Sequence, residues 1–174
     1  GASMQTHASL SAARGILRFY ESTGDESFLR TAEELFALYC REGMTENYAN
    51  DNWFDRPGWT EPCAVIDSYM LASGFFDNTG DSRYLLIAQR IFYNAMGFAQ
   101  RSNGGFGCDN CVGAQEPFVH PKEEYFEAYW CCTMRGGEGL ARAAENMLRT
   151  DADTLYILRP GDADIELDGQ RIRM

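Results

Sequence analysis

Hydrophobic residues recur at helical spacing over much of the chain. Apolar side chains three and four residues apart fall on one face of an α-helix. This spacing predicts helices near residues 8–22, 26–42, 62–76 and 81–98, and a fifth helix over 134–148. The apolar face of each helix has to pack against a neighbouring element, so the pattern favours paired helices around a shared core.

A turn pattern occurs twice, and it sets the expected architecture. Residues 19–29 and 75–85 share the pattern Phe-x-x-x-Thr-Gly-Asp-x-x-aromatic-Leu at an offset of 56 residues. In each copy the glycine can take the left-handed conformation that closes a helix, and the aspartate can cap the next one. A fixed period of this length is typical of stacked supersecondary units. Two helices per unit, with long loops between units, predict an α/α toroid or superhelix.

The pattern changes from helical to extended near the end of the chain. Residues 154–158 are β-prone, Pro160-Gly161 predicts a turn, and Asp168-Gly169 is a hairpin signal between alternating apolar residues. The sequence therefore predicts short antiparallel strands in this part.

These patterns divide the chain into two expected parts. Residues 4–150 would form part of an (α/α)6 toroid built of helical hairpins, and residues 151–174 the first strands of a β-sandwich. The expected fold class is mainly α. Because five helices do not close a ring of six hairpins, we expect a fragment, or a chain that completes its ring with a partner. A homodimer is one such arrangement.

Composition and charge narrow the classes of partner. The chain has 174 residues, of which 45% are hydrophobic, and a formal net charge of −11. Lysine and arginine contacts to phosphate dominate nucleic-acid affinity, so this charge argues against a nucleic-acid partner. No apolar run reaches the length of about 18 residues that predicts a membrane helix. A carbohydrate suits an acidic protein, and the compartment stays open between the cytoplasm and the periplasm or exterior of a bacterium.

Two long loops carry most of the chemistry. Loops 43–61 and 99–130 exceed the length of about 12–15 residues that structureless connections usually have, and such loops are often functional. Each follows the second helix of a hairpin, so both should emerge on the same face. Trp53, Trp59 and Trp130 are candidate substrate-binding residues, because flat rings suit a sugar. The same rings could instead fill the core.

Cysteines supply the sharper signal. Glu61 and Cys63 open one predicted helix, and Cys131 and Cys132 lie just ahead of another. Helix starts favour anionic ligands, and three thiolates with one carboxylate complete a tetrahedral zinc shell. Disulfides are disfavoured because adjacent cysteines rarely pair with each other. The competing explanation is a set of buried, unreactive thiols.

Two further cysteines leave the ligand set open. Cys108 and Cys111 have the Cys-x-x-Cys spacing of zinc and redox sites, so they could replace some of these ligands or form a second site. His120 could join them, although a lone histidine is more often structural, and His7 is a weaker candidate still. Cys40 falls within a predicted helix and is expected in the core.

A resemblance brings these motifs together. Glu-x-Cys at 61–63, Tyr129-Trp-Cys-Cys132 and the helix that follows resemble the β-L-arabinofuranosidase group of cysteine glycosidases, glycoside hydrolase family 127. The resemblance spans about residues 8–174 and includes the Thr-Gly-Asp hairpins. It implies an (α/α)6 barrel and retaining hydrolysis.

The resemblance also implies roles for individual residues. By position, Glu61, Cys63, Cys131 and Cys132 match the zinc ligands, and Cys131 matches the nucleophile. Glu46 is the best match to the acid/base glutamate.

The leading expectation is therefore a glycosidase that hydrolyses an L-arabinofuranoside-type glycan with a zinc-bound cysteine, this chain being a piece of it that is inactive by itself. The alternative is a non-catalytic helical module, stapled by zinc, that binds a glycan or a protein. A redox function of Cys108 and Cys111 is disfavoured because no strand–helix redox fold surrounds them.

Overall fold

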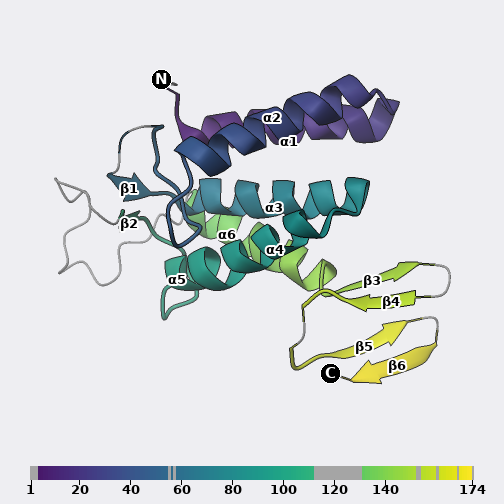
Figure 1. The fold of residues 1–174 in the computed structure, drawn as a ribbon. Coiled ribbons are helices and arrows are strands. Elements are labelled where there is room, and N and C mark those ends of the chain that lie inside the picture. The colour runs from purple at the N-terminus through teal and green to yellow at the C-terminus, as the bar shows by residue number, and fades with distance from the viewer. Residues whose placement is uncertain are drawn as a thin grey trace.

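Helical hairpins dominate the computed structural model, which describes residues 4–54, 56, 58–111, 131–151, 154–159, 161–167 and 169–173 (Figure 1). The helices are α1 (Thr6–Thr23), α2 (Glu26–Glu42), α3 (Pro62–Thr79), α4 (Ser82–Arg90), the π-helical segment η1 (Ile91–Met96), α5 (Gly97–Ala99) and α6 (Cys132–Glu145). The strands are β1 (Trp59–Thr60), β2 (Asp109–Asn110), β3 (Leu148–Asp151), β4 (Thr154–Ile157), β5 (Asp164–Leu167) and β6 (Gln170–Arg173). They pair in sequence order into antiparallel two-stranded sheets. The prediction of a mainly helical fold is confirmed.

The two Thr-Gly-Asp turns have the same geometry, as the repeat predicts. Gly24 and Gly80 have φ of 72° and 69°, and each donates its backbone N–H to the carbonyl four residues earlier. Asp25 and Asp81 each accept a hydrogen bond at 2.9 Å from the backbone N–H two residues later. The glycine ends one helix and the aspartate begins the next, so each turn makes a tight helical hairpin.

Helix α3 lies at the centre of the helical layers. It packs against α1 and α6, and also against α4 and η1, which follow it in the sequence. Helix α2 packs mainly on α1 (Figure 1). Apolar residues occur all around α3, as expected for a helix enclosed by neighbours. The largest apolar side chains of the main core cluster, each at most 2% exposed, are Leu10, Phe36, Tyr39, Ile66, Leu71, Phe75, Ile91 and Met96.

The helix predicted over 81–98 covers the correct residues but is not regular. It begins as α4, widens into η1 and ends as α5. A π-helical turn contains more residues than an α-helical one, which shifts the faces of the residues that follow. Within η1 this places Ile91, Ala95 and Met96 in the interior.

The fifth predicted helix is displaced. We expected residues 134–148, whereas α6 begins at Cys132 and ends at Glu145. Leu148 leaves the helix because it pairs with Ile157 across β3 and β4. The predicted hairpin is confirmed: β5 and β6 pair antiparallel, and Gly169 has φ of 74°. The β-sandwich and the division near residue 150 stay predictions.

The first turns of α1, α3 and α6 lie together at one end of the molecule, beside β1 and β2 (Figure 1). Thr6, at the start of α1, bonds the loop before β1 through its backbone N–H to Asn52 O at 3.0 Å and its hydroxyl to Asp51 O at 2.8 Å. This end of the molecule carries the candidate site.

Among the described residues, none of the helices has both the length and the apolar character that crossing a lipid bilayer requires.

Candidate metal centre

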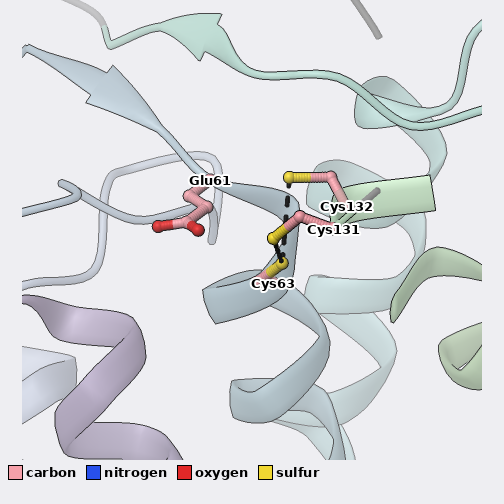
Figure 2. A group of neighbouring side chains, drawn as sticks. All are labelled: Glu61, Cys63, Cys131 and Cys132. Carbon is pink, nitrogen blue, oxygen red and sulfur yellow. Dashed lines mark hydrogen bonds between the residues drawn. The ribbon is translucent and has the colours of Figure 1, made fainter. Parts of the chain in front are cut away.

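The four predicted ligands lie together, although they come from two distant segments. Glu61 and Cys63 stand at the start of α3, and Cys131 and Cys132 at the start of α6 (Figure 2). One potential ligand atom from each of the four residues lies within 4.8 Å of the others. The Cys63 sulfur is 3.0 Å from that of Cys131 and 3.8 Å from that of Cys132. The arrangement can hold a metal ion.

Local sequence explains why these side chains gather at helix starts. Pro62 occupies the first turn of α3, where a missing N–H costs no helical hydrogen bond. Glu61 and Cys131 are the residues that precede α3 and α6, so both helices direct their first backbone amides toward this end. The positive ends of the two helix dipoles favour thiolate and carboxylate there.

The donor set and one of its two sulfur–sulfur distances suit a zinc ion. Zn²⁺ takes four ligands in a tetrahedron with Zn–S distances of about 2.3 Å, which places two sulfurs about 3.8 Å apart. The distance from Cys63 to Cys132 matches this spacing, and the distance from Cys63 to Cys131 is shorter. Soft thiolates select zinc over hard cations such as magnesium.

Most of the clustered cysteines are protonated thiols at neutral pH. Hydrogen bonds from the thiols of Cys108 and Cys63 lower the pKa of Cys132 to about 3. The bond to Cys132 in turn raises the pKa of Cys63 well above its usual range, and burial adds to this rise. Burial also raises the pKa of Cys131 and the pKa of Glu61. One thiolate is therefore stable at neutral pH, and further deprotonation needs a cation close by.

Glu61 is held by a buried network of amides. The Gln5 side chain donates to Glu61 Oε2 at 3.1 Å, and the backbone N–H of Glu61 donates to Asn50 Oδ1 at 3.1 Å. Asn50 is fully buried, and it also bonds the hydroxyls of Thr6 and Thr60. Outer partners of this kind orient a ligating carboxylate. Neither Gln5 nor Asn50 was predicted as a site residue.

A buried ionic cluster lies one turn further along α3. Asp67 is fully buried and binds three residues of α1, namely His7, Ser11 and Arg14, at 2.9, 2.8 and 2.5 Å. It also bonds Arg135 of α6. This cluster was not predicted, although one signal was available: Asp67 is the one charged residue in the largely apolar run 62–72. The cluster joins the three helices whose first turns form the site.

The two residues of the Cys-x-x-Cys pair have different partners. The Cys108 thiol bonds Cys132, whereas the Cys111 thiol donates to the carbonyl oxygen of Asn50 at 3.4 Å and also bonds Asp51. Within the described residues, neither belongs to the group of four potential ligands. All six cysteines have free thiols in the structure.

The remaining candidate residues are spread over the same end of the molecule or lie outside the described residues. Trp59 is half-buried and packs against the cysteine cluster, whereas Trp53 is 40% exposed. Glu46 is exposed in the loop between α2 and β1. Trp130 and His120 lie outside the described residues.

Comparison with known proteins identifies the family. The family model described as β-L-arabinofuranosidase, GH127 catalytic domain, matches residues 3–145. The chain therefore belongs to this family of glycoside hydrolases, in agreement with the resemblance drawn from the Glu-x-Cys and Cys-Cys motifs. No curated protein matches the chain.

Solved structures define the fold. The GH127 β-L-arabinofuranosidase Ara127N of Geobacillus stearothermophilus T6 is 17% identical with a TM-score of 0.65, and the match covers 93% of this chain and 29% of that one. An inactive variant of the α-1,6-mannanase GH76A of Salegentibacter sp. HEL1_6, in complex with α-1,6-mannotriose, is 14% identical with a TM-score of 0.61 and coverages of 82% and 42%. The chain thus has the helical fold of (α/α)6-toroid glycosidases and spans less than half the length of either structure.

Proposed function

We propose that this chain carries the nucleophile side of a retaining glycosidase that acts on L-arabinofuranoside-type glycans. The observation that carries the proposal is the unequal exposure of the cluster: Cys63 and Cys132 are at most 2% exposed, whereas Cys131 is partly open to solvent. A nucleophile has to reach its substrate, so Cys131 is the sulfur suited to this role. The family implies a carbohydrate as the substrate.

The zinc assignment rests on the donor set of Glu61, Cys63, Cys131 and Cys132. When bound, Zn²⁺ would supply the positive charge that keeps these thiols deprotonated at neutral pH. The carboxylate of Glu61 is already oriented for this role by the Gln5 side chain.

The reaction would then follow the two-step scheme with sulfur in place of one carboxylate. The Cys131 sulfur attacks the anomeric carbon and forms a carbon–sulfur bond, while the bond to the leaving oxygen breaks and an acid protonates that oxygen. In the second step the residue that acted as the acid acts as a base and takes a proton from water. The water oxygen attacks the anomeric carbon, the carbon–sulfur bond breaks, and Cys131 is released. Two inversions at the anomeric carbon give overall retention.

For the acid/base we propose Glu46, on the basis of its position in the loop before Glu61. Its side chain is exposed to solvent. The aromatic side chains of Trp53, Trp59 and Trp130 are the proposed sugar-binding surfaces. Of Trp53 and Trp59, Trp59 is the better placed because it packs beside the cysteines.

The test combines activity with detection of the covalent intermediate. Because we expect the piece to be inactive by itself, hydrolysis of p-nitrophenyl β-L-arabinofuranoside is measured on the full-length enzyme, as the wild type, as Cys131→Ser and as the control Cys111→Ser. Acid-quenched wild-type protein is digested, and peptides are searched for an added pentosyl group. We expect activity to fall by more than a thousandfold in Cys131→Ser and to persist in the control, with the sugar on Cys131. A sugar found on another residue, or turnover that survives Cys131→Ser, would refute the assignment.

Burial of three of the four groups favours one alternative, a closed zinc site that only staples the loops of a binding module. In that case all glycosides tested would remain intact. Zinc would still stabilise the fold, and the variants Cys131→Ser and Cys132→Ser would lose equal amounts of stability.

A further inference from the structure

A cavity lies near the metal centre, at the end of the molecule where α5 approaches β1 and β2 (Figure 1). It has a volume of about 120 Å³ and lies between the loop after α2, strand β2 and the helical end formed by η1 and α5. None of the four proposed metal ligands lines it, so it is separate from the site described above.

Small apolar side chains form the floor of the cavity. Val65 of α3, Ala95 of η1 and Ala99 of α5 line it and are each at most 4% exposed. An alanine side chain ends at Cβ, so two alanines on one helical end leave space that larger residues would fill. The π-helical segment places Ala95 in the interior, and such segments are frequent at functional sites.

An exposed aromatic ring completes the apolar part of the lining. Phe98 of α5 lines the cavity and is 66% exposed, so a ligand that covers its ring gains free energy by removing apolar surface from water. Tyr93 of η1 is exposed to a similar extent, at 56%, but it does not line the cavity and packs edge-on against Phe92. A ligand in the cavity would therefore cover Phe98 and leave Tyr93 in solvent.

Polar groups from two segments add hydrogen-bonding capacity to the lining. In the loop after α2 the Thr45 hydroxyl donates to Asn47 Oδ1 at 2.6 Å, and β2 contributes Asp109 and Asn110. Arg101 binds both carboxylate oxygens of Asp109, at 3.0 and 3.2 Å, which fixes this carboxylate. Amide, hydroxyl and carboxylate groups at fixed positions can bond several hydroxyls of one ligand.

The charge of the lining excludes acidic ligands. Among the described residues that line the cavity, Asp109 and Cys111 are the ionisable ones, and lysine, arginine and histidine do not occur. A phosphate or a sugar acid would lose water here without gaining a counter-charge from the lining. The cavity therefore suits a neutral ligand.

The volume limits the ligand to one small ring. A cavity of about 150 Å³ can hold one benzene molecule, so this one holds a single ring at most. A sugar ring has apolar C–H groups on its faces and hydroxyls at its edge. This distribution matches an apolar floor with polar groups around it.

The cavity and the metal centre share a wall. Thr60 lines the cavity, and its hydroxyl donates to Asn50 Oδ1 at 2.9 Å, the same oxygen that accepts the backbone N–H of Glu61. Ala99, on the cavity floor, belongs to the same buried cluster as Cys63. The cavity is therefore adjacent to the metal centre, although other residues line it.

We propose that this cavity is a second carbohydrate-binding site, which holds one neutral sugar unit with its C–H face against Phe98 and its hydroxyls toward Asn47 and Asn110. The proposal rests on the proposed function only for the class of ligand, a glycan. It does not depend on the metal or on the nucleophile.

The test follows the alanine methyl signals of the full chain, labelled with carbon-13, by NMR during titration with small molecules. Ala49 and Ala95 line the cavity and report on its occupant, whereas Ala13 in the helical core is the internal control. The probes are the neutral sugars L-arabinose and D-galactose, the acid D-galacturonate and the apolar ring cyclohexanol. The titrations are repeated on Phe98→Ala and on the matched control Tyr93→Ala.

We expect at least one neutral sugar to shift the Ala49 and Ala95 signals with a Kd in the millimolar range, because one ring offers few atoms for contact. D-galacturonate should bind at least about tenfold more weakly than D-galactose. Phe98→Ala should weaken sugar binding by about threefold to tenfold, as expected for loss of one aromatic contact, and Tyr93→Ala should match the wild type. Asn47→Ala should weaken the binding of sugar but not of cyclohexanol.

Four results would overturn the proposal. The first is the absence of any shift at Ala95 with both neutral sugars at concentrations well above a millimolar Kd. The second is tighter binding of cyclohexanol than of either sugar, which would make the cavity an apolar site. The third is a preference for D-galacturonate, and the fourth is an equal effect of Phe98→Ala and Tyr93→Ala, which would place the sugar elsewhere.

The outcome is distinguishable from a failure of the proposed function. The methyl signals report binding without turnover and without a metal ion. Glycosidase activity that survives Cys131→Ser would refute the nucleophile and leave this measurement intact, whereas a cavity that binds no sugar would leave the Cys131 assignment unaffected.

Discussion

Arg14 of α1 donates to Asp67 of α3 across 2.5 Å, and the carboxylate that receives this bond is completely shielded from solvent. A buried charge is costly unless its partners replace the lost water. Here they do, because His7 and Ser11 bind the second oxygen of Asp67, and Arg135 shares the first. The contact therefore fixes α1, α3 and α6 at the level just below the cysteine cluster.

Removal of the Asp67 carboxylate should strongly destabilise the fold. We expect Asp67→Ala to lower the free energy of unfolding by about 3 kcal/mol, because it leaves Arg14 and Arg135 without their buried counter-charge. Asp77→Ala on the same helix is the control: its salt bridge with Arg149 spans 2.7 Å, but Asp77 is 37% exposed, so the loss should stay within about 1 kcal/mol. Urea unfolding followed by circular dichroism measures both. Equal losses would contradict the special role of Asp67.

Stability should depend on pH through His7. The hydrogen bond with Asp67 raises the pKa of His7 above its ordinary value of 6.5. Burial opposes ionisation of Asp67, but His7, Arg135 and the other donors more than offset it and keep the pKa of Asp67 below 3.8. The charged pair therefore stabilises the fold fully between pH 3.8 and pH 6.5. This contribution is lost as the pH rises through the raised pKa of His7, and also as the pH falls through the lowered pKa of Asp67.

The pH dependence can be isolated with one substitution. We expect His7→Gln to cost about 1 kcal/mol at pH 5.5 and clearly less at pH 9, measured as the difference in free energy of unfolding from the wild type. The exposed Glu34→Gln of α2 serves as the control and should show the same difference at both pH values. A His7→Gln effect that does not change with pH would mean that the pair is not charged in the folded protein.

Three glycines of α6 should respond differently to alanine. A Cβ at Gly136 would lie 2.1 Å from the Phe106 ring, and one at Gly139 would lie 2.4 Å from Ile66, whereas nothing lies within 4 Å at Gly137. We expect Gly136→Ala and Gly139→Ala each to lose about 1–3 kcal/mol through overpacking. Gly137→Ala should gain about 0.5–1 kcal/mol from higher helix propensity. The midpoint of thermal unfolding shows whether each variant is less or more stable than the wild type. A Gly136→Ala variant that is more stable than the wild type would contradict the close packing of the Phe106 loop on α6.

Metal content provides the most direct test of the proposed zinc site. We expect about one zinc per chain by elemental analysis of the purified, reduced protein, as one tetrahedral shell requires. The metal should be lost in Cys132→Ser and retained in Cys111→Ser, whose sulfur lies outside the group of four. Zinc that persists in Cys132→Ser would place the ion elsewhere, and its absence from the wild type would leave the cysteines as buried thiols.

Much of the fold was predictable because local patterns determine it. Gly24 and Gly80 close their helices in the conformation that the turn pattern predicts, and both aspartates act as caps. The end of α6 was not predictable from periodicity, since Leu148 is as compatible with a helix as with a strand. Its pairing with Ile157 decides its conformation, and such tertiary contacts are not visible in a local pattern.

The candidate site was partly predictable for a related reason. Glu61, Cys63, Cys131 and Cys132 are of the residue types that bind metals, so their chemistry singled them out before their proximity was known. The supporting residues Gln5, Asn50 and Asp67 have ordinary side chains whose role depends on three-dimensional neighbours. The spacing of Cys108 and Cys111 suggested a joint role, but the backbone between them turns one thiol toward Cys132 and the other toward Asn50.

The sequence distance across the cysteine cluster has a consequence for synthesis. Cys63 and Cys131 touch, yet 68 positions separate them along the chain. At about 5–20 residues per second, roughly 3–14 s pass between the translation of these two codons. Glu61 and Cys63 are therefore synthesised well before the other two members of the group. The four side chains can come together only once the start of α6 has docked against the start of α3, so an ion bound at the proposed site would depend on this long-range contact.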